Sequence, residues 1–251
     1  MFTTGQAFEK VFFDDSYNII GENEGKQYLI FDDGKNVVEI TSYYFDNKNY
    51  IIKNKDFVYG PHTFYKDGKE SQVSDIQLDP LASYSSHTIF PVYLKNKGYV
   101  YYTFEGKKAF EEVYQKASTF DSNDRAIVNE DNDYYLITTE GKKSSSKYVH
   151  IELIDNGYYA GYTTQNKYEV IDKDGNIVIN DIFMGTKEIV TYNEHVYGIF
   201  NKNGKTYIYD MKDEYKVVFD VQGDVVFDEA GYFIVNQKSY YSIEGKKIYP
   251  R

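Results

Sequence analysis

The chain has 251 residues, no cysteine and a formal net charge of −11, from 28 Lys and Arg against 39 Asp and Glu. The absence of cysteine excludes disulfides and thiol-based metal or catalytic sites, and the negative charge disfavours nucleic acid, whose phosphate backbone it would repel. At this length a compact fold buries about 70–75% of the surface of its unfolded chain, so a stable core needs no cross-links.

Aromatic residues make up 18% of the chain, with 29 Tyr and 17 Phe, which favours half-buried β-strands. A unit of about 35 residues recurs, and a period of this size indicates a repeat array. Each copy opens with an aromatic or aliphatic residue beside a turn residue, and it ends in a turn that usually contains glycine. The spacing is nearly constant: 21 residues separate Phe13 from Gly34, Phe120 from Gly141, and Ile154 from Gly175.

Seven copies follow one another in the chain. Their approximate bounds are 8–40, 41–72, 73–110, 111–145, 146–180, 181–219 and 220–251. Their opening pairs are Phe13-Asp14, Phe45-Asp46, Tyr84-Ser85, Phe120-Asp121, Ile154-Asp155, Tyr192-Asn193 and Phe227-Asp228. Their closing turns contain Gly34, Gly68, Gly106, Gly141, Gly175, Glu214 and Gly245, so the sixth copy replaces the glycine.

The fifth copy shows the internal plan of four short strands. Residues 148–154 alternate Val149, Ile151 and Leu153 with polar or aromatic positions, the pattern of a half-buried strand. Asp155-Asn156-Gly157 predicts a turn, residues 158–163 and 168–172 the second and third strands, and residues 177–179 the fourth. Between the last two strands, Gly175 stands where a Cβ would be strained.

No window of eleven or more residues has apolar side chains at helical spacing between caps. Residues 108–117 come nearest to that pattern, and we interpret them as strand and loop. The sequence therefore predicts an all-β protein without helices.

Four strands in each of seven copies predict a seven-bladed β-propeller in a single domain, residues 1–251. Six or eight blades, or an open β-solenoid, are the alternatives. The ring is favoured because terminal solenoid repeats normally depart from the pattern, whereas the first and last copies keep it. Residues 8–13 either begin the first blade or complete the seventh.

One family resembles this pattern. Residues 167–179, Lys-Tyr-Glu-Val-Ile-Asp-Lys-Asp-Gly-Asn-Ile-Val-Ile, are similar to the core of the bacterial WG-repeat family, and residues 120–128 resemble its lead-in strand. The Trp-Gly pair of that family is replaced, since the chain has no Trp. Tyr168-Glu169, Tyr134-Tyr135 and Tyr207-Ile208 stand in its place. The resemblance implies a non-enzymatic β-repeat module, often on secreted, lipid-anchored or membrane-tethered bacterial proteins, and it brings no catalytic residues.

Charged residues gather in several turns. Lys107-Lys108, Lys142-Lys143 and Lys246-Lys247 are expected to be solvated turn lysines that discourage edge pairing, and a basic patch on one rim is the alternative. Residues 130–133 and 172–175 offer oxygen ligands for calcium. Neither segment has the spacing of a calcium-binding loop, so we interpret both as turns.

Motifs for catalysis or metal binding are absent from the sequence. His62, His87, His150 and His195 fall in different copies and form no zinc-binding pair, so they are interpreted as ordinary strand or loop residues. The run Ser144-Ser145-Ser146 has no neighbouring base, and no nucleophile elbow or phosphate-binding glycine loop occurs. A pair of carboxylates about 5–10 Å apart would suffice for glycoside hydrolysis, so an axial pair remains the enzymatic alternative.

Most tyrosines are expected to fill the space between sheets. In the pairs Tyr43-Tyr44 and Tyr101-Tyr102, one ring on each face of a strand predicts that one of them reaches solvent. An exposed tyrosine patch would suit a protein or a sugar.

We expect a non-enzymatic binding module with no cofactor, most simply a monomeric scaffold for protein–protein interaction. Carbohydrate binding through surface tyrosines is the first alternative, and a hydrolase the second. The chain has no apolar run long enough to span a membrane. Residues 1–6 have neither a basic region nor an apolar core, so we expect them not to be a signal peptide. The expected location is extracellular or at a bacterial cell surface as a mature domain, and a cytoplasmic location is also compatible with the sequence.

Overall fold

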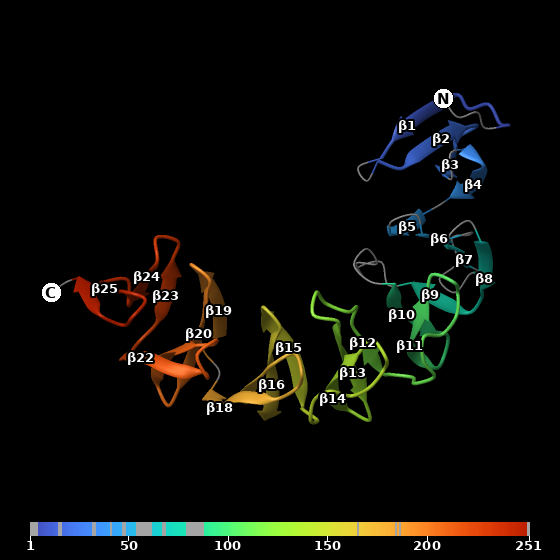
Figure 1. Ribbon diagram of the computed structural model, residues 1–251. Helices are drawn as coiled ribbons and strands as arrows, with labels where there is room; N and C mark the ends of the chain where they lie inside the picture. The colour runs from blue at the N-terminus through green and yellow to red at the C-terminus, as the bar shows by residue number, and fades with distance from the viewer. Residues whose placement is uncertain are drawn as a thin grey trace. The chain divides into compact units, whose positions relative to one another are not determined.

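The computed structural model describes residues 5–14, 17–31, 34–40, 42–46, 49–53, 62–66, 69–78, 88–164, 166–183, 185 and 187–249; for 42–46, 49, 50, 52 and 53 it describes the backbone alone. Within these residues the protein is all-β, with seven antiparallel sheets and no α-helix (Figure 1). The prediction of an all-β fold is confirmed. Residues 108–117 form a loop that ends in a two-residue strand, as expected.

The chain forms two compact units. The first comprises residues 1–130 and 138–142. Sheet A is β1 (Lys10–Phe13), β2 (Ile19–Asn23), β3 (Lys26–Phe31) and β4 (Asn36–Ile40). Sheet B is β5 (Ser42–Asp46), β6 (Asn49–Lys53), β7 (His62–Lys66) and β8 (Lys69–Val73). Sheet C is β9 (Ile76–Leu78), β10 (Ile89–Leu94) and β11 (Gly98–Thr103).

The second unit comprises residues 131–137 and 143–251, and sheet D spans the boundary in sequence. Sheet D is β12 (Lys116–Ala117), β13 (Arg125–Glu130) and β14 (Asp133–Thr138). Sheet E is β15 (His150–Asp155), β16 (Tyr158–Thr164), β17 (Lys167–Ile171) and β18 (Ile177–Phe183). Sheet F is β19 (Lys187–Tyr192), β20 (His195–Lys202), β21 (Lys205–Asp210) and β22 (Lys216–Gln222). Sheet G is β23 (Val225–Asp228), β24 (Tyr232–Val235), β25 (Ser239–Tyr241) and β26 (Lys247–Tyr249).

Sheet E contains the four strands predicted for the fifth copy. Its first strand begins at His150 rather than Tyr148, because Tyr148 pairs instead with Tyr134 in β14. The alternation predicted there holds only in part: Ile151 is buried, whereas Val149 and Leu153 are exposed. Ile151 pairs with Gly161 in the sheet, while Leu153 lies at a register shift, where a β-bulge re-aims side chains.

Sheets C and D have three regular strands each. In both, a fourth segment follows the glycine turn and joins the third strand through two isolated bridges. The bridges are Tyr99 with Tyr114 and Tyr102 with Lys108 in sheet C, and Tyr134 with Tyr148 and Ile137 with Lys143 in sheet D. The segment after Gly141 contains the three serines. The Ser145 hydroxyl accepts the backbone N–H of Leu136 at 2.9 Å, so a side chain replaces a backbone partner and the ladder is irregular.

Four of the glycine turns share one hydrogen-bond pattern. The N–H of Gly106, Gly141, Gly175 and Gly245 donates to the carbonyl three residues earlier, at 2.9–3.0 Å. Their φ angles lie between +69° and +82°, which confirms that these positions require a left-handed backbone. In the sixth copy Glu214 and Tyr215 both adopt positive φ instead. The second copy's turn, with Gly68, lies outside the described residues.

Neighbouring sheets bury apolar faces against each other. Sheet A packs Ile20 and Leu29 against Tyr65 of sheet B, and sheet B packs Phe64 against Phe90 of sheet C. In the second unit, sheet F is covered on both faces: Phe200 lies in the core shared with sheet E, and Ile199 in the core shared with sheet G. The stacking of sheets, rather than any single sheet, therefore forms the core of each unit.

The buried tyrosines make the stability of the fold sensitive to alkaline pH. Burial raises the pKa of Tyr65, Tyr114 and Tyr158 to about 12, with neighbouring acidic groups adding to the effect. An unfolded tyrosine ionises near pH 10, so the unfolded chain loses these protons first as the pH rises. We expect stability to be unaffected by these groups below pH 10 and to fall as the pH rises toward 12.

Parallel titrations of tyrosinate absorbance and of far-ultraviolet circular dichroism would measure this loss. Tyr65→Phe should make the decline above pH 10 shallower. A native protein whose tyrosines all titrated near pH 10 would contradict the prediction.

Candidate binding site

A groove of about 430 Å³ lies in the first unit, where the β7–β8 hairpin of sheet B meets the turn that follows β11 in sheet C. Its lining consists of Lys66, Lys69, Glu70, Ser71, Glu105 and Lys107. One side of the groove is formed by the end of β7 and the start of β8, and the other side by the turn that follows β11 in the next copy. The repeat itself therefore brings these charged residues together.

The sheet C side of the groove is held by Glu105. Its backbone carbonyl accepts the Ser71 hydroxyl at 2.7 Å, and its carboxylate pairs with Lys66 and accepts the Thr103 hydroxyl at 3.0 Å. The hydrogen bonds from Lys66 and Thr103 hold the pKa of Glu105 below its usual value. A carboxylate held in its ionised form can pair with a cationic group of a ligand.

The sheet B side is organised around Glu70. One oxygen of its carboxylate accepts the Tyr65 hydroxyl at 3.2 Å, and the other accepts the Gln72 amide at 3.4 Å. Glu70 also lines a second groove of about 390 Å³ beside β4 and β7. The other residues of that groove are Val38, Glu39, Ile40, Thr63, Tyr65 and Gln72.

The two grooves differ in chemistry. Among the described residues, three lysines and two carboxylates line the first groove, and none of its lining residues is aromatic. The described lining of the second groove contains one ring, Tyr65, which is 7% exposed and therefore offers no open stacking face. The described surface of these grooves thus favours charged and hydrogen-bonding ligands over stacked sugar rings.

A separate charged cluster connects sheets E and F in the second unit. Lys187, at the start of β19, pairs with Glu152 in β15 and lies over the rings of Tyr162 and Tyr168, at 5.2 and 5.9 Å from their centres. The Tyr162 hydroxyl donates to Glu152 at 2.6 Å. Burial lowers the pKa of Lys187. These contacts fasten the first strands of sheets E and F together, which is a structural role.

Tyr168 and Tyr101 form a matched pair for a stability test. Both side chains are buried, but the Tyr168 hydroxyl has no hydrogen-bond partner in the described part of the chain, whereas the Tyr101 hydroxyl donates to the Ser118 carbonyl at 2.7 Å. Removing an unsatisfied buried hydroxyl relieves a desolvation penalty, while removing a satisfied one leaves its acceptor unpaired. We expect Tyr168→Phe to raise the free energy of unfolding by about 1 kcal/mol and Tyr101→Phe to lower it by about 1–2 kcal/mol.

Urea unfolding of the two variants, followed by circular dichroism, would provide the comparison. Equal losses of stability would mean that Tyr168 has an acceptor in solution.

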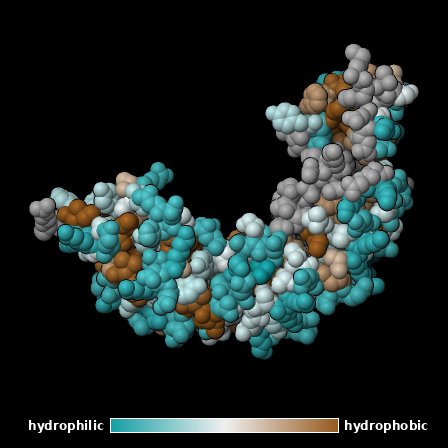
Figure 2. All heavy atoms as spheres, viewed as in Figure 1, coloured by the Kyte–Doolittle hydropathy of each residue, from teal (hydrophilic) through white to brown (hydrophobic). Residues whose placement is uncertain are grey.

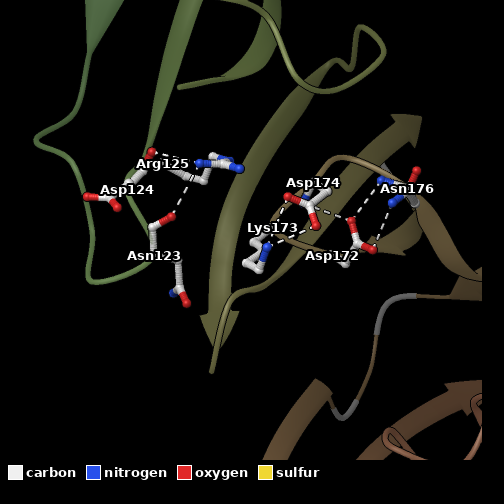
Figure 3. Close-up of polar contacts among 7 residues, drawn as sticks. All are labelled: Asn123, Asp124, Arg125, Asp172, Lys173, Asp174 and Asn176. Carbon is white, nitrogen blue, oxygen red and sulfur yellow. Dashed lines mark hydrogen bonds and ion pairs between the residues drawn. The ribbon is translucent and has the colours of Figure 1, made fainter. Parts of the chain in front are cut away.

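The acidic segments behave as turns, as expected. The Asp172 carboxylate accepts the backbone N–H of Asp174 and Asn176, at 2.9 and 2.8 Å, and Lys173 pairs with Asp174 (Figure 3). In the same view Arg125 donates to the carbonyls of Asn123 and Asp124. Asp131 and Asn132 have positive φ, which is typical of a tight turn. Among the described residues, no three His, Asp or Glu side chains gather around a possible metal position.

The turn lysines have local partners. Lys108 pairs with Glu111 at 2.7 Å, Lys142 pairs with Glu140 at 2.9 Å, and Lys143 lies 4.0 Å from the centre of the Tyr135 ring. Lys107 lines the first groove. Sequence reasoning placed Lys69, Glu105 and Lys107 in glycine turns but assigned no binding residue. Lys66 and Glu70 are their close neighbours in the repeat, and the repeat period could have identified them.

The histidines occupy unrelated environments. His62 is 2% exposed within β7, His150 lies between the rings of Tyr134 and Tyr162, and His195 approaches Asp210 at 3.7 Å. These surroundings fit the interpretation of ordinary strand histidines. His87 lies outside the described residues.

The tyrosines fill the space between sheets, as predicted, with Tyr101, Tyr114, Tyr159 and Tyr168 almost inaccessible. The expectation that one ring of Tyr101-Tyr102 reaches solvent is wrong, because both faces of sheet C are covered and the two exposures are 0% and 8%. The side chains of Tyr43 and Tyr44 lie outside the described set. Among the described residues, the exposed tyrosines are Tyr17, Tyr232, Tyr240 and Tyr249.

No family model matches the chain, and no curated protein matches it. Among solved structures, it is similar to a eukaryotic initiation factor at 12% identity, covering 96% of this chain and 73% of that one, with a TM-score of 0.47. It is also similar to apo AztD from Citrobacter koseri, at 11% identity, 95% and 84% coverage and a TM-score of 0.39. It is similar as well to Hsv2 of Kluyveromyces lactis, at 9% identity, covering 79% of this chain and 72% of that one, with a TM-score of 0.33. At these values no function is transferred to this chain.

Across the described part of the chain, no helix has the length and apolar character needed to cross a membrane.

Proposed function

We propose that the chain is a non-enzymatic binding module, a single seven-bladed β-propeller over residues 1–251 that acts as a monomeric scaffold for a protein partner. The seven sheets of the described residues, and the glycine turn that recurs between their strands, support this architecture. Kinship with the bacterial WG-repeat family, and a location outside the cell or at its surface, belong to the same proposal. They are supported by the resemblance of residues 167–179.

The charged groove between sheets B and C is the observation that carries the choice of a protein partner. Its alternating lysines and carboxylates suit a peptide segment that bears both signs of charge.

A peptide array that varies charge and spacing would test this function directly. We expect binding to peptides in which acidic residues flank a basic one, and binding should weaken with salt. Reversing the groove charge with Lys69→Glu and Lys107→Glu should weaken binding at least tenfold. Lys238→Glu, an equally exposed site in the turn between β24 and β25, is the matched control. Equal binding by both variants would contradict the proposed groove.

Carbohydrate binding is the second candidate, because Tyr232, Tyr240 and Tyr249 are all exposed on sheet G. The rings of Tyr240 and Tyr249 lie 6.2 Å apart in an edge-to-face arrangement. Loss of a glycan-array signal on Tyr240→Ala would favour this candidate, and a flat response from the unmodified protein would argue against it.

A further inference from the structure

Strand β8 lies between the two grooves of the first unit. It is the last strand in the described order of sheet B, so every second residue directs its backbone N–H and carbonyl groups away from β7. An edge of this kind is a template on which an extended peptide can pair as an additional strand. Figure 2 shows hydrophilic residues over the region of the first unit that β8 occupies in Figure 1.

The edge of β8 is more regular than the corresponding edges of most other sheets. Register shifts interrupt the pairing of β18, β22 and β26 with the third strands of sheets E, F and G. Bulges of this kind twist an edge away from a new partner. In sheets C and D the fourth segment joins through isolated bridges instead of a ladder. By contrast, β8 pairs with β7 without a shift, a regularity that β4 shares among the described fourth strands.

The face of β8 toward sheet A presents negative charge. Glu70 pairs with Tyr65 in sheet B, and Tyr65 lies in the core shared with sheet A, so Glu70 is on that face. The charged residues in the described lining of the second groove are Glu39 and Glu70. Glu39 pairs with Lys26 at 3.0 Å, whereas the described partners of Glu70, Tyr65 and Gln72, are neutral. A basic residue directly opposite Glu70 on an added strand would match its charge.

The face of β8 toward sheet C presents positive charge. Lys69 and Ser71 flank Glu70 in the strand, so their side chains lie on the opposite face. The Ser71 hydroxyl donates to the Glu105 carbonyl in the turn of sheet C at 2.7 Å. One of the three lysines of the first groove is ion-paired with Glu105, which leaves Lys69 and Lys107 to attract acidic residues.

The two faces together define the sequence of a matching strand. Successive residues of a strand point to opposite faces of a sheet. A residue opposite Glu70 would therefore enter the second groove, and the residues before and after it, opposite Lys69 and Ser71, would enter the first. A basic residue between two acidic residues matches β8 on both faces. This order reads the same in both directions, so it fits a parallel or an antiparallel strand.

We propose that an extended segment of the protein partner pairs with β8 as a fifth strand of sheet B, with a basic residue opposite Glu70 and an acidic residue on each side of it. This inference rests on the proposed function and specifies how the peptide binds. Main-chain hydrogen bonds to β8 supply affinity, and the alternate side chains supply specificity. The charges on β8 disfavour apolar or like-charged strands at the same edge.

A scan of backbone N-methylation tests the added strand. The probe is the capped peptide Thr-Thr-Glu-Lys-Glu-Thr-Thr, and each variant of it carries one N-methyl group. Only every second N–H of an added strand points toward β8. Methylation at those residues should weaken binding to the full chain by at least about tenfold, and at the intervening residues by less than about threefold. A uniform response along the peptide, measured by isothermal titration calorimetry, would overturn the added strand even if the unmodified peptide binds.

A charge exchange tests the position of the basic residue. We expect the unmodified protein to bind the Lys-centred peptide at least about threefold more tightly than a Glu-centred one, and Glu70→Lys to invert this preference. Tight binding of the Glu-centred peptide would show that the variant is folded. Glu112→Lys, an exposed position of the same unit outside the described lining of both grooves, should leave the preference unchanged.

An unchanged preference in Glu70→Lys would overturn the placement of the basic residue. Failure of the proposed function gives a different result: neither peptide binds the unmodified protein, or reversing the groove charge at Lys69 and Lys107 has no effect. Either of those outcomes would overturn this inference as well.

Discussion

Replacement of Gly175 by alanine is expected to lower the free energy of unfolding by about 2–5 kcal/mol, by two separate effects. At φ +82° a Cβ is strained whatever surrounds it, and this costs about 1–2 kcal/mol. The same Cβ would overlap the carbonyl oxygen of Ser144, which belongs to the hydrogen-bonded segment beside β14 and cannot move freely. The variant must therefore also shift sheet D relative to the turn.

Gly204→Ala separates the two effects. Gly204 has nearly the same φ, +76°, but a Cβ there would meet nothing within 4 Å. It should lose only the conformational part, about 1–2 kcal/mol. Urea unfolding of both variants, followed by tyrosine fluorescence and circular dichroism, would compare them. Equal losses would show that the glycine turn does not dock on the neighbouring sheet.

The parts of the fold that depend on local chemistry could be predicted from the sequence. Asp155-Asn156-Gly157 and Asp172-Lys173-Asp174-Gly175 form turns at the predicted positions, because Asx side chains bond nearby backbone and glycine accepts positive φ. The strands between them follow from alternation and β propensity. The sequence did not show whether residues 8–13 begin the first copy or complete the seventh. In the structure β1, within that segment, pairs with β2 in sheet A.

The features that depend on neighbouring sheets could not be predicted from a single copy. Tyr101 and Tyr102 lie on opposite faces of β11, which suggested one exposed ring, but sheet C is covered on both faces. The outer segments of sheets C and D are irregular because side chains and isolated bridges replace a regular ladder. No motif marks the candidate groove either. Its residues come from the ends of β7 and β8 in one copy and from the turn after β11 in the next, so only the repeat and its stacking bring Glu70 and Glu105 to one place.

Phe200→Ala is expected to lower the free energy of unfolding by about 3–5 kcal/mol, the loss typical of a large ring removed from a packed core. Phe200 is fully buried in the core that sheets E and F share, and its ring centre lies 6.1 Å from that of Tyr209. It also lies against Gly198, which has no side chain that could swing into the space left behind. The cavity should therefore remain open, and the loss should lie toward the upper end of this range.

Phe200→Leu keeps most of the apolar volume, so it should lose clearly less free energy of unfolding than the alanine variant. The gap between the two losses should scale with the difference in buried apolar area. Glu188→Ala, on the strand that pairs with β20, changes an exposed side chain and should alter stability by no more than about 0.5 kcal/mol. Denaturant unfolding with two probes would show whether each variant still unfolds in one step. If Phe200→Ala lost less than Phe200→Leu, or as little as Glu188→Ala, sheets E and F would not share a core in solution. The packing of sheet against sheet, which positions the turns of each copy, would then not be explained by shared apolar cores.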